Sequence, residues 1–440
     1  MYWISISLTF DENFKYLLPY SIILVPSFLG IFYGLITYIF SIFDSKKLIN
    51  SFLLFSIIFG SMEFIRGYIF TGFPWNLIAF SFSEFKIFLQ ILSVIGTYSF
   101  NLVCISIFTC PAIFFLRKSP KELFIIFLFL LISIGFVTFG FIKSDNFLKK
   151  NIKQNDYIIR SISSNISLDR FYKENEEEKI LEDLIFLSKP DKKYPTIFIW
   201  PEGLVSSNNI KYFNYHLSKN FSEKHIILMG VTNIKKIDKV EKYFNSIVVL
   251  DNNFNVIDQY DKVKLVPFGE FIPFQRILGK IGFKTITNNY QSFSSGDVRN
   301  IFNIKSNNLE VKLLPLICYE IIYSGEIFKK QNFDFIINIS EDGWFGKSIG
   351  PKQHFAHSIF RSIENGKYII RSANNGISAI INPLGEIEKK IKFRESGFID
   401  FIESRSTDTT PFTKYGNKIF LFIILLYIFL IFSFNKFKNE

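Results

Sequence analysis

The chain has 440 residues, of which 49% are hydrophobic and 20% are charged, and its formal net charge is +11. This length allows two or three domains with a sizeable core. A nucleic-acid surface would need clustered Lys and Arg with stacking aromatics, whereas many of the 56 Phe here lie in long apolar runs near the two ends. The composition therefore indicates a membrane protein and argues against a nucleic-acid partner.

Four apolar segments in the first third of the chain predict transmembrane helices. The first has no charge and is long enough to cross a hydrocarbon core of about 30 Å. In the second, Glu63 and Arg66 share a helix face, which permits a structural ion pair near the membrane surface or a contact with a lipid head group. The aromatic turn that follows suits Trp75 to the membrane interface. The predicted spans are residues 16–43, 49–70, 87–116 and 123–142.

Loop charges predict the orientation of these spans. Basic residues occupy the loops between spans one and two and between spans three and four, so both loops should be cytoplasmic. The Trp75 loop and everything after Lys143 are then outside, and so is Met1, although residues 1–12 lack the regions of a signal peptide. Either the start of the chain is missing or an unusual N-terminus is translocated. The loop residues concerned are Lys46, Lys47, Arg117, Lys118 and Lys121.

From residue 151 the composition is that of a soluble domain. Short apolar strand candidates alternate with helical patterns, which predicts a layered α/β domain ending near Ser404. A fifth apolar span, 419–434, precedes Lys436 and Lys438, so its end should be cytoplasmic. The expected strands are 157–162, 196–200, 225–231, a hairpin through 246–257, 312–318, 333–338, and 368–372 paired with 377–381; the expected helices are 169–187 and 353–366.

Three predicted strand ends carry reactive groups, namely Glu202, Lys262 and Cys318. A thiol with a pKa of about 8.5 is mostly protonated at neutral pH, so a nearby carboxylate base would be needed to activate it. A lysine ammonium could stabilise the oxyanion of an acyl intermediate. Singly, each residue has an ordinary explanation as a turn Glu, a solvated Lys or a packing Cys, and spacing alone cannot join them. Cys104 and Cys110 lie in an apolar segment as packing residues, so no disulfide framework is expected.

Several blocks nevertheless resemble a known family. Trp200-Pro-Glu202, Lys262 through Pro273, and Ile317-Cys318-Tyr-Glu320 are similar to the three signature blocks of the nitrilase, or carbon-nitrogen hydrolase, superfamily. Further blocks resemble its membrane branch, the apolipoprotein N-acyltransferases, and together they cover nearly the whole chain. These blocks are residues 70–76, 342–354, 371–379 and 382–385.

The resemblance implies an architecture and a location. We expect an α/β fold, a four-layer αββα nitrilase-like sandwich, inserted between N-terminal transmembrane helices and one C-terminal helix. The expected parts are a transmembrane domain at 1–145 that lacks the family's first helices, a catalytic domain at 151–405, and a transmembrane helix at 417–436. The implied place is the bacterial inner membrane, with the catalytic domain in the periplasm, in agreement with the loop charges.

The resemblance also implies roles for individual residues. Glu202 would be the proton acceptor, Lys262 the oxyanion stabiliser and Cys318 the nucleophile. Glu270 would help to hold the lysine and the acyl intermediate, and the backbone N–H of Tyr319 is a candidate second oxyanion donor. Supporting positions beside the nucleophile are Tyr319 and Glu320, and candidates for contact with substrate or membrane are Trp75, Trp344, Phe271, Ile272, Phe274 and residues 278–283, with core packing as the alternative for the last four.

The reaction implied is acyl transfer between two lipid-anchored substrates. Cys318 would take an acyl group from a phospholipid and pass it to the N-terminal diacylglyceryl-cysteine of an apolipoprotein. We expect a monomer without a cofactor. His354 and His357 share a helix face but lack a third ligand, so no metal is expected.

Besides the absence of the family's first helices, two departures from the family pattern concern single positions, none of the three touches the catalytic residue types, and two alternative functions remain open. Glu341 stands where the family usually has Asn, and an early tryptophan of the catalytic domain has no clear counterpart, the nearest aromatics being Phe171 and Tyr172. A membrane-tethered amidase that passes the acyl group to water is one alternative. A catalytically inactive membrane scaffold is the other.

Overall fold

The computed structural model describes residues 2–436, apart from 44, 46, 172–175, 211–217, 275–284, 286–290, 307–308 and 327–331. Within these residues, four N-terminal helical segments are long and apolar enough to cross a membrane, which confirms the four predicted spans. They contain the helices α1 (Leu18–Phe43), α2 (Leu48–Arg66), α4 (Leu92–Leu116) and α5 (Phe124–Leu148).

Two of the helix boundaries differ from the predicted ones. The helix α2 ends at Arg66; a Cβ on the next residue, Gly67, would lie 2.0 Å from the hydroxyl of Tyr98, and the backbone then has positive φ at residues 70–72. The third predicted span is divided into α3 (Lys86–Leu89) and α4, and α4 is kinked at Gly96, where φ is 72°. A Cβ at Gly96 would lie 2.0 Å from the ring of Phe412, so only glycine fits there.

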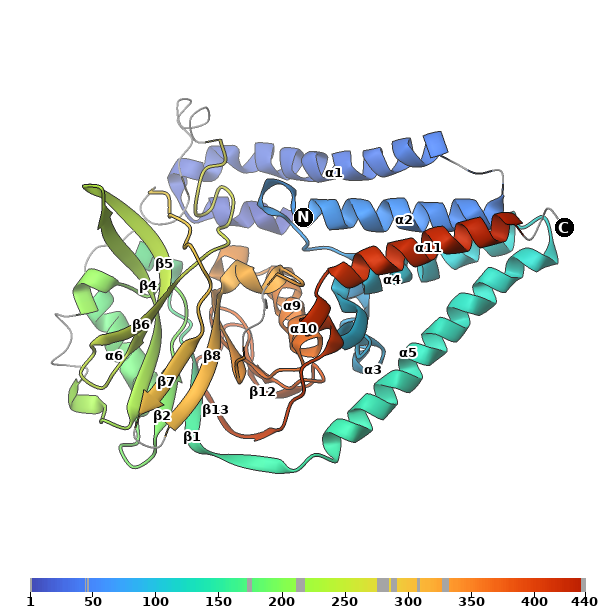
Figure 1. The fold of residues 1–440 in the computed structure, drawn as a ribbon. Coiled ribbons are helices and arrows are strands. Elements are labelled where there is room, and N and C mark those ends of the chain that lie inside the picture. Colours follow the sequence, from blue (N-terminus) through green and yellow to red (C-terminus); the bar gives the residue numbers. More distant parts are fainter. Residues whose placement is uncertain are drawn as a thin grey trace.

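Further elements lie at the two ends of the membrane part. The short 3₁₀ helices η1 (Tyr2–Thr9) and η2 (Glu12–Leu17) precede α1, and α10 (Pro411–Tyr415) leads into the apolar helix α11 (Lys418–Lys436). Figure 1 shows α11 beside α2 and α4, in agreement with their contacts. The α1–α2 and α4–α5 connections and the end of α11 lie together at the end of the helices that is farther from the sheets (Figure 1).

The described strands form two sheets. In the first, the order is β13-β1-β2-β4-β5-β6 with β3 beside β4; in the second it is β12-β11-β10-β9-β8-β7. The first sheet consists of β1 (Ile152–Ser163), β2 (Thr196–Ile199), β3 (Val205–Ser206), β4 (His225–Ile237), β5 (Val240–Leu250), β6 (Val256–Asp261) and β13 (Gly397–Arg405). The second consists of β7 (Phe302–Ser306), β8 (Leu309–Ile317), β9 (Phe335–Glu341), β10 (Ile369–Asn374), β11 (Ser378–Ile381) and β12 (Ile387–Ile391).

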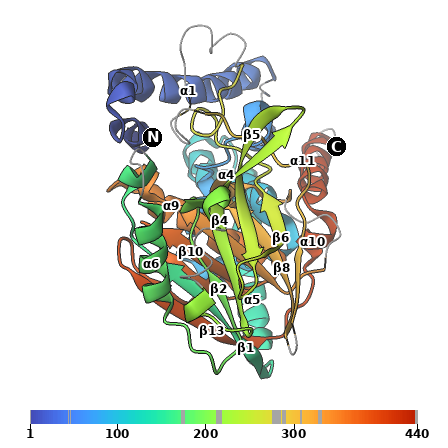
Figure 2. The same ribbon diagram turned by 90° about the vertical axis from the view of Figure 1, so that its left-hand side faces the viewer.

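The alternation of side chains along the strands produces four layers. On β2, Ile197 and Ile199 face the core between the two sheets, whereas Phe198 packs with α6 (Glu177–Ser188) on the outer face. The helix α9 (Gly350–Asn365) covers the outer face of the second sheet and also contacts α4. The predicted αββα sandwich is therefore confirmed: Figure 1 shows α6 and α9 on opposite sides of the strands, and Figure 2 looks onto the first sheet from the side of α6.

One predicted helix starts in a different place. The helix expected from residue 169 begins at Glu177, and Leu168–Phe171 form a separate 3₁₀ helix, η6. Residues 172–175 lie outside the described part, and so does Tyr172.

Candidate active site

Glu202 and Lys262 meet at one edge of the first sheet. Glu202 follows β2 and Lys262 follows β6; the pairing of β2, β4, β5 and β6 makes these two strands run in the same direction, so their ends share an edge. Gly230 on β4 allows the chain at Glu202 to cross closely, since a Cβ there would lie 2.5 Å from the carbonyl oxygen of Pro201. Both Glu202 and Lys262 are buried.

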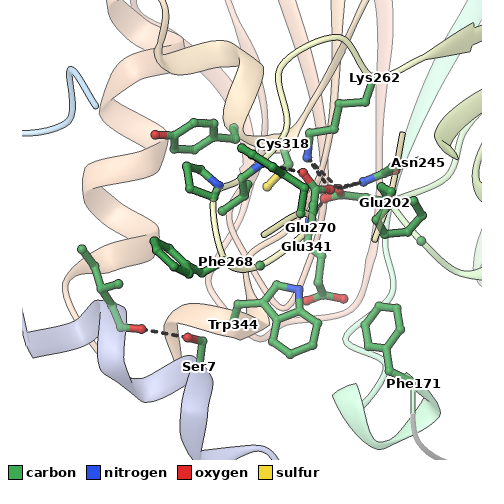
Figure 3. A pocket seen from close by; sticks show the side chains of 18 of the residues that line it. Ser7, Phe171, Glu202, Asn245, Lys262, Phe268, Glu270, Cys318, Glu341 and Trp344 are labelled. Carbon is green, nitrogen blue, oxygen red and sulfur yellow. Dashed lines mark hydrogen bonds and ion pairs between the residues drawn. The ribbon is translucent and has the colours of Figure 1, made fainter. Parts of the chain in front are cut away.

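Cys318 is delivered from the second sheet. It follows β8 directly and starts the 3₁₀ helix η10 (Cys318–Ile322). Its φ is +46°, a left-handed conformation that costs a non-glycine residue about 1–3 kcal/mol and persists where the surroundings enforce it. Figure 3 shows Cys318 pointing toward the cluster of Glu202, Lys262 and Glu270. The sequence-predicted base, cation and thiol are therefore brought together.

Hydrogen bonds interlock the polar groups of this cluster. Lys262 Nζ donates to Glu270 Oε1 at 2.9 Å and lies 3.5 Å from Glu202 Oε1. Asn245 Nδ2, on β5, donates to Glu202 Oε1 and to Glu270 Oε1, each at 2.7 Å. The backbone N–H of Glu341 donates to Glu202 Oε2 at 2.7 Å. One ammonium and one amide thus hold two carboxylates in place.

Burial and neighbouring charges set the protonation of the cluster. Burial raises the pKa of Glu202, and the charge of Lys262 opposes this shift only in part. Burial disfavours the charge on Lys262, but Glu270 and Glu202 together outweigh it and hold the pKa of the ammonium above its ordinary value. Burial, aided by the Glu202 charge, raises the pKa of the Cys318 thiol. The surroundings therefore disfavour ionisation of the Cys318 thiol, make the Glu202 carboxylate more basic and favour the charged form of Lys262.

The two residues after Cys318 fix the turn through hydrogen bonds to groups outside the cluster. Glu320 is fully buried and accepts hydrogen bonds from Arg299 Nη2 at 2.9 Å and from the backbone N–H of Ile317 at 2.8 Å. Its carboxylate also accepts from the backbone of residues 263 and 264, just after Lys262. Tyr319 donates its hydroxyl to the carbonyl of Gly72 at 2.9 Å, which connects the turn to the membrane part.

A cavity of about 2180 Å³ adjoins the cluster. Cys318, Glu202 and Lys262 contribute to its wall, and so do apolar side chains of α1, among them Phe28 and Phe32. The same space is therefore bounded by reactive polar groups and by a membrane-spanning helix.

The candidate substrate or membrane contacts divide into cavity-lining and exposed residues. Trp344 lines the cavity and stacks on Phe171, with 5.2 Å between ring centroids. Phe271 lines it and is half-buried, whereas Phe274 also lines it but is 67% exposed. Ile272 is buried, which favours packing over bilayer contact. Residues 278–283 lie outside the described part.

Trp75 is not at an exposed interface. It is 3% exposed, donates from Nε1 to Gln353 Oε1 at 2.9 Å, and is covered by Trp3 of η1, with 4.8 Å between ring centroids. Trp75 therefore lies buried in the cavity wall, because the N-terminal helix packs over it, and its contact with substrate or membrane stays a prediction.

Residues 63 and 66 form the structural pair that the sequence left open. Arg66 pairs with Glu63 inside the helix bundle and also donates to the carbonyl of Phe73 at 2.7 Å and to Asn76 Oδ1 at 2.8 Å. The pair therefore holds the loop that leads to Trp75.

Several site residues were not predicted. The sequence gives only a weak indication of Asn245 as a site residue: it is a polar residue on the same strand face as the inward-facing Ile247 and Val249. Glu341 pairs with Arg170, whose Nη2 donates to Oε2 at 2.6 Å, and no sequence pattern links residues so far apart. The unusual carboxylate at 341 is therefore neutralised by a buried arginine.

Metal-ligating side chains do not gather in threes anywhere in the described ranges. His354 instead contacts Asp342 and the carbonyl of Cys318, and His357 packs against Phe80 and Trp75.

Comparisons with known proteins extend these observations. The family model described as the apolipoprotein N-acyltransferase N-terminal domain matches residues 1–110, and the carbon-nitrogen hydrolase model matches residues 216–400. The apolipoprotein N-acyltransferase of Rickettsia prowazekii is 32% identical over 447 residues, covering 99% of this chain and 88% of that protein. The corresponding protein of Brucella melitensis is 29% identical, covering 91% of this chain and 76% of its own length.

Similar solved structures are more distant. An amidase from Nesterenkonia sp. AN1 is 11% identical and covers 57% of this chain and 91% of its own, with a TM-score of 0.40. Nit3 of Saccharomyces cerevisiae, described as a member of the nitrilase superfamily, is 16% identical over 56% of this chain and 90% of its own, with a TM-score of 0.38.

Proposed function

This chain belongs to the apolipoprotein N-acyltransferase family, and from that premise we propose that it transfers an acyl group from a phospholipid, through a thioester on Cys318, to the N-terminal diacylglyceryl-cysteine of an apolipoprotein. One observation carries the proposal. The buried, left-handed Cys318 shares a single cavity with Glu202, Lys262 and the apolar wall of α1. Such a cavity suits a substrate with a long acyl chain and a reactive carbonyl.

In the first step, the Cys318 sulfur attacks the ester carbonyl carbon of the phospholipid while Glu202 accepts the thiol proton. The raised pKa of Glu202 favours this transfer from a thiol whose own pKa is raised. Lys262 Nζ and the backbone N–H of Tyr319 stabilise the tetrahedral oxyanion. Its collapse breaks the ester C–O bond, and the departing lysophospholipid oxygen takes the proton back from Glu202.

In the second step, the α-amine of the acceptor attacks the thioester carbonyl. Glu202 deprotonates the attacking nitrogen, the C–S bond breaks, and the proton returns to the departing Cys318 thiolate. Glu270 and Asn245 hold Glu202 and Lys262 in position through both steps. Glu270 accepts from Lys262 at 2.9 Å, and Asn245 donates to Glu202 and to Glu270 at 2.7 Å. The product is an amide, and the thiol is regenerated.

We also propose that the chain spans the inner membrane with its sheets in the periplasm. The two loops that contain Lys47 and Arg117 lie at the end of the helices away from the sheets, which is the cytoplasmic end by the positive-inside rule (Figure 1). The proposed parts are those expected from the sequence: 1–145, 151–405 and 417–436. Confinement of both lipid-anchored substrates beside the thiol would raise their effective concentration.

The test is incubation of the purified full chain with phospholipid vesicles and a synthetic diacylated lipopeptide that carries a free N-terminal cysteine amine. We expect triacylated peptide and lysophospholipid in equal amounts. Release of free fatty acid without triacylated peptide would refute the transferase proposal and indicate a hydrolase. Formation of neither product would indicate a scaffold without catalytic activity.

A further inference from the structure

His354 contacts the main chain of the proposed nucleophile. It lies on α9, is fully buried, and its Nε2 is 3.2 Å from the carbonyl oxygen of Cys318. A carbonyl oxygen can only accept a hydrogen bond, so Nε2 carries a proton whether the ring is neutral or charged. The ring is therefore the donor in this hydrogen bond.

The orientation of this ring is fixed from its other edge and from its face. Nδ1 lies 2.9 Å from Asp342 Oδ1, and Arg371 Nη2 lies 3.2 Å from the same nitrogen. Asp342 is itself held by Arg371, which donates to Oδ2 at 2.8 Å, and by Ser340, which donates to Oδ1 at 2.7 Å. The indole of Trp75 stacks on the ring, with centroids 5.4 Å apart. None of these groups takes part in the proposed proton transfers, so their shared effect is to hold the His354 ring in one orientation.

The hydrogen bond to Cys318 has a consequence for the next residue. In a trans peptide the C=O and the following N–H lie in one plane and point in opposite directions. Fixing the carbonyl of Cys318 on the His354 side therefore fixes the direction of the Tyr319 N–H. The left-handed φ of Cys318 is a conformation that this residue would not adopt alone, so an external contact is needed to hold it.

We propose that His354 is a positioning residue for acyl transfer, which holds the Cys318–Tyr319 peptide so that the Tyr319 N–H serves as the second oxyanion donor opposite Lys262. This inference rests on the proposed function, because an oxyanion forms only if the Cys318 thiol attacks an acyl carbonyl. It assigns to the Asp342–His354 pair a role in geometry and none in proton transfer.

The experiment compares two reactions of the same thiol in the detergent-purified full chain. Acylation of Cys318 by phospholipid requires oxyanion stabilisation, whereas alkylation by iodoacetamide is a direct displacement at carbon that forms no oxyanion. The variants are His354→Phe, which retains a ring without the donor, and His354→Gln, which retains an N–H near the position of Nε2. The matched control is His357→Phe, a ring exchange at an equally buried position of the same helix.

We expect His354→Phe to slow single-turnover acylation roughly tenfold to a hundredfold, below the 10²–10³ cost of removing an oxyanion donor outright. Alkylation should stay within about twofold of the wild-type rate, His354→Gln should recover most of the acylation rate, and the control should retain it. Three outcomes would each overturn the inference. The first is an acylation rate in His354→Phe equal to that of the wild type, and the second is an alkylation rate that falls in parallel with acylation. The third is an equal loss of acylation in His354→Phe and His354→Gln.

Two further comparisons keep the test decisive. If His354→Phe does not yield folded protein, His354→Met, which also lacks a donor, takes its place against His354→Gln. Absence of acylation in the wild-type chain itself would contradict the proposed function, whereas normal wild-type acylation with unaffected variants contradicts only the role of His354.

Discussion

Replacement of Asn245 by Ala should move the acid limb of the pH–rate profile upward. The amide donates to one side-chain oxygen of Glu202 and one of Glu270 at 2.7 Å each, and its hydrogen bond to Glu202 favours the charged form of that carboxyl group. A hydrogen bond to a charged group contributes about 1.5–3 kcal/mol, which at 1.36 kcal/mol per pKa unit corresponds to roughly one to two units. Without the amide the pKa of Glu202 rises further. As the pH is lowered, the carboxylate is then protonated at a higher pH than in the wild type.

The assay is the pH dependence of kcat/KM for transfer from phospholipid to the diacylated lipopeptide, which reports the free enzyme. The wild-type acid limb should already lie above the pKa of an ordinary glutamate, because burial raises that of Glu202. The matched control is Asn233→Ala on the neighbouring strand β4, also buried, whose Oδ1 accepts from Ser207 outside the cluster. An unshifted limb in Asn245→Ala, or an equal shift in the control, would refute the reasoning.

Three further changes test other parts of the site. Lys262→Met should lower kcat at least a hundredfold, because it removes the cation that stabilises the oxyanion. Lys264→Met, at a half-exposed position, should change kcat less than threefold. Similar kcat values for the two variants would contradict the role of Lys262 as the oxyanion stabiliser. Glu320→Gln should destabilise the chain by about 3–5 kcal/mol, because it removes the charge that pairs with Arg299, whose side chain is only 14% exposed, and an unchanged denaturation midpoint in detergent would contradict this. Phe274→Ser should raise the KM for phospholipid vesicles roughly tenfold without lowering kcat, whereas Phe186→Ser, at a comparably exposed position outside the cavity, should not; equal KM values for the two variants would exclude Phe274 as a lipid contact.

The sequence predicted those features of the fold that depend on local patterns. Short continuous apolar runs such as 196–200 marked buried strands, and much longer ones marked membrane spans, because burial on all sides selects apolar residues along the whole element. Boundaries were less accurate where the tertiary structure decides them. The end of α2 at Arg66 and the kink of α4 at Gly96 depend on neighbours that lie far away in the chain.

The site could be predicted only as far as its residues carry a chemical pattern. Glu202, Lys262 and Cys318 were identified as candidates from strand ends and from a resemblance, and the structure brings them together. Asn245 and the Arg170–Glu341 pair act through contacts between distant segments, which no local period records. Tryptophan is common at membrane–water interfaces, yet Trp75 is buried beneath Trp3, because the packing of the N-terminal helix outweighs that preference.

Intact-mass analysis of the full chain after exposure to phospholipid tests the central claim most directly. The account predicts one added acyl group on the wild-type protein and on Cys110→Ser, a control at a buried thiol of α4, and none on Cys318→Ala. The adduct should disappear when the diacylated lipopeptide is added. An unchanged wild-type mass, or an adduct that persists in Cys318→Ala, would contradict the assignment of Cys318 as the carrier of the acyl group.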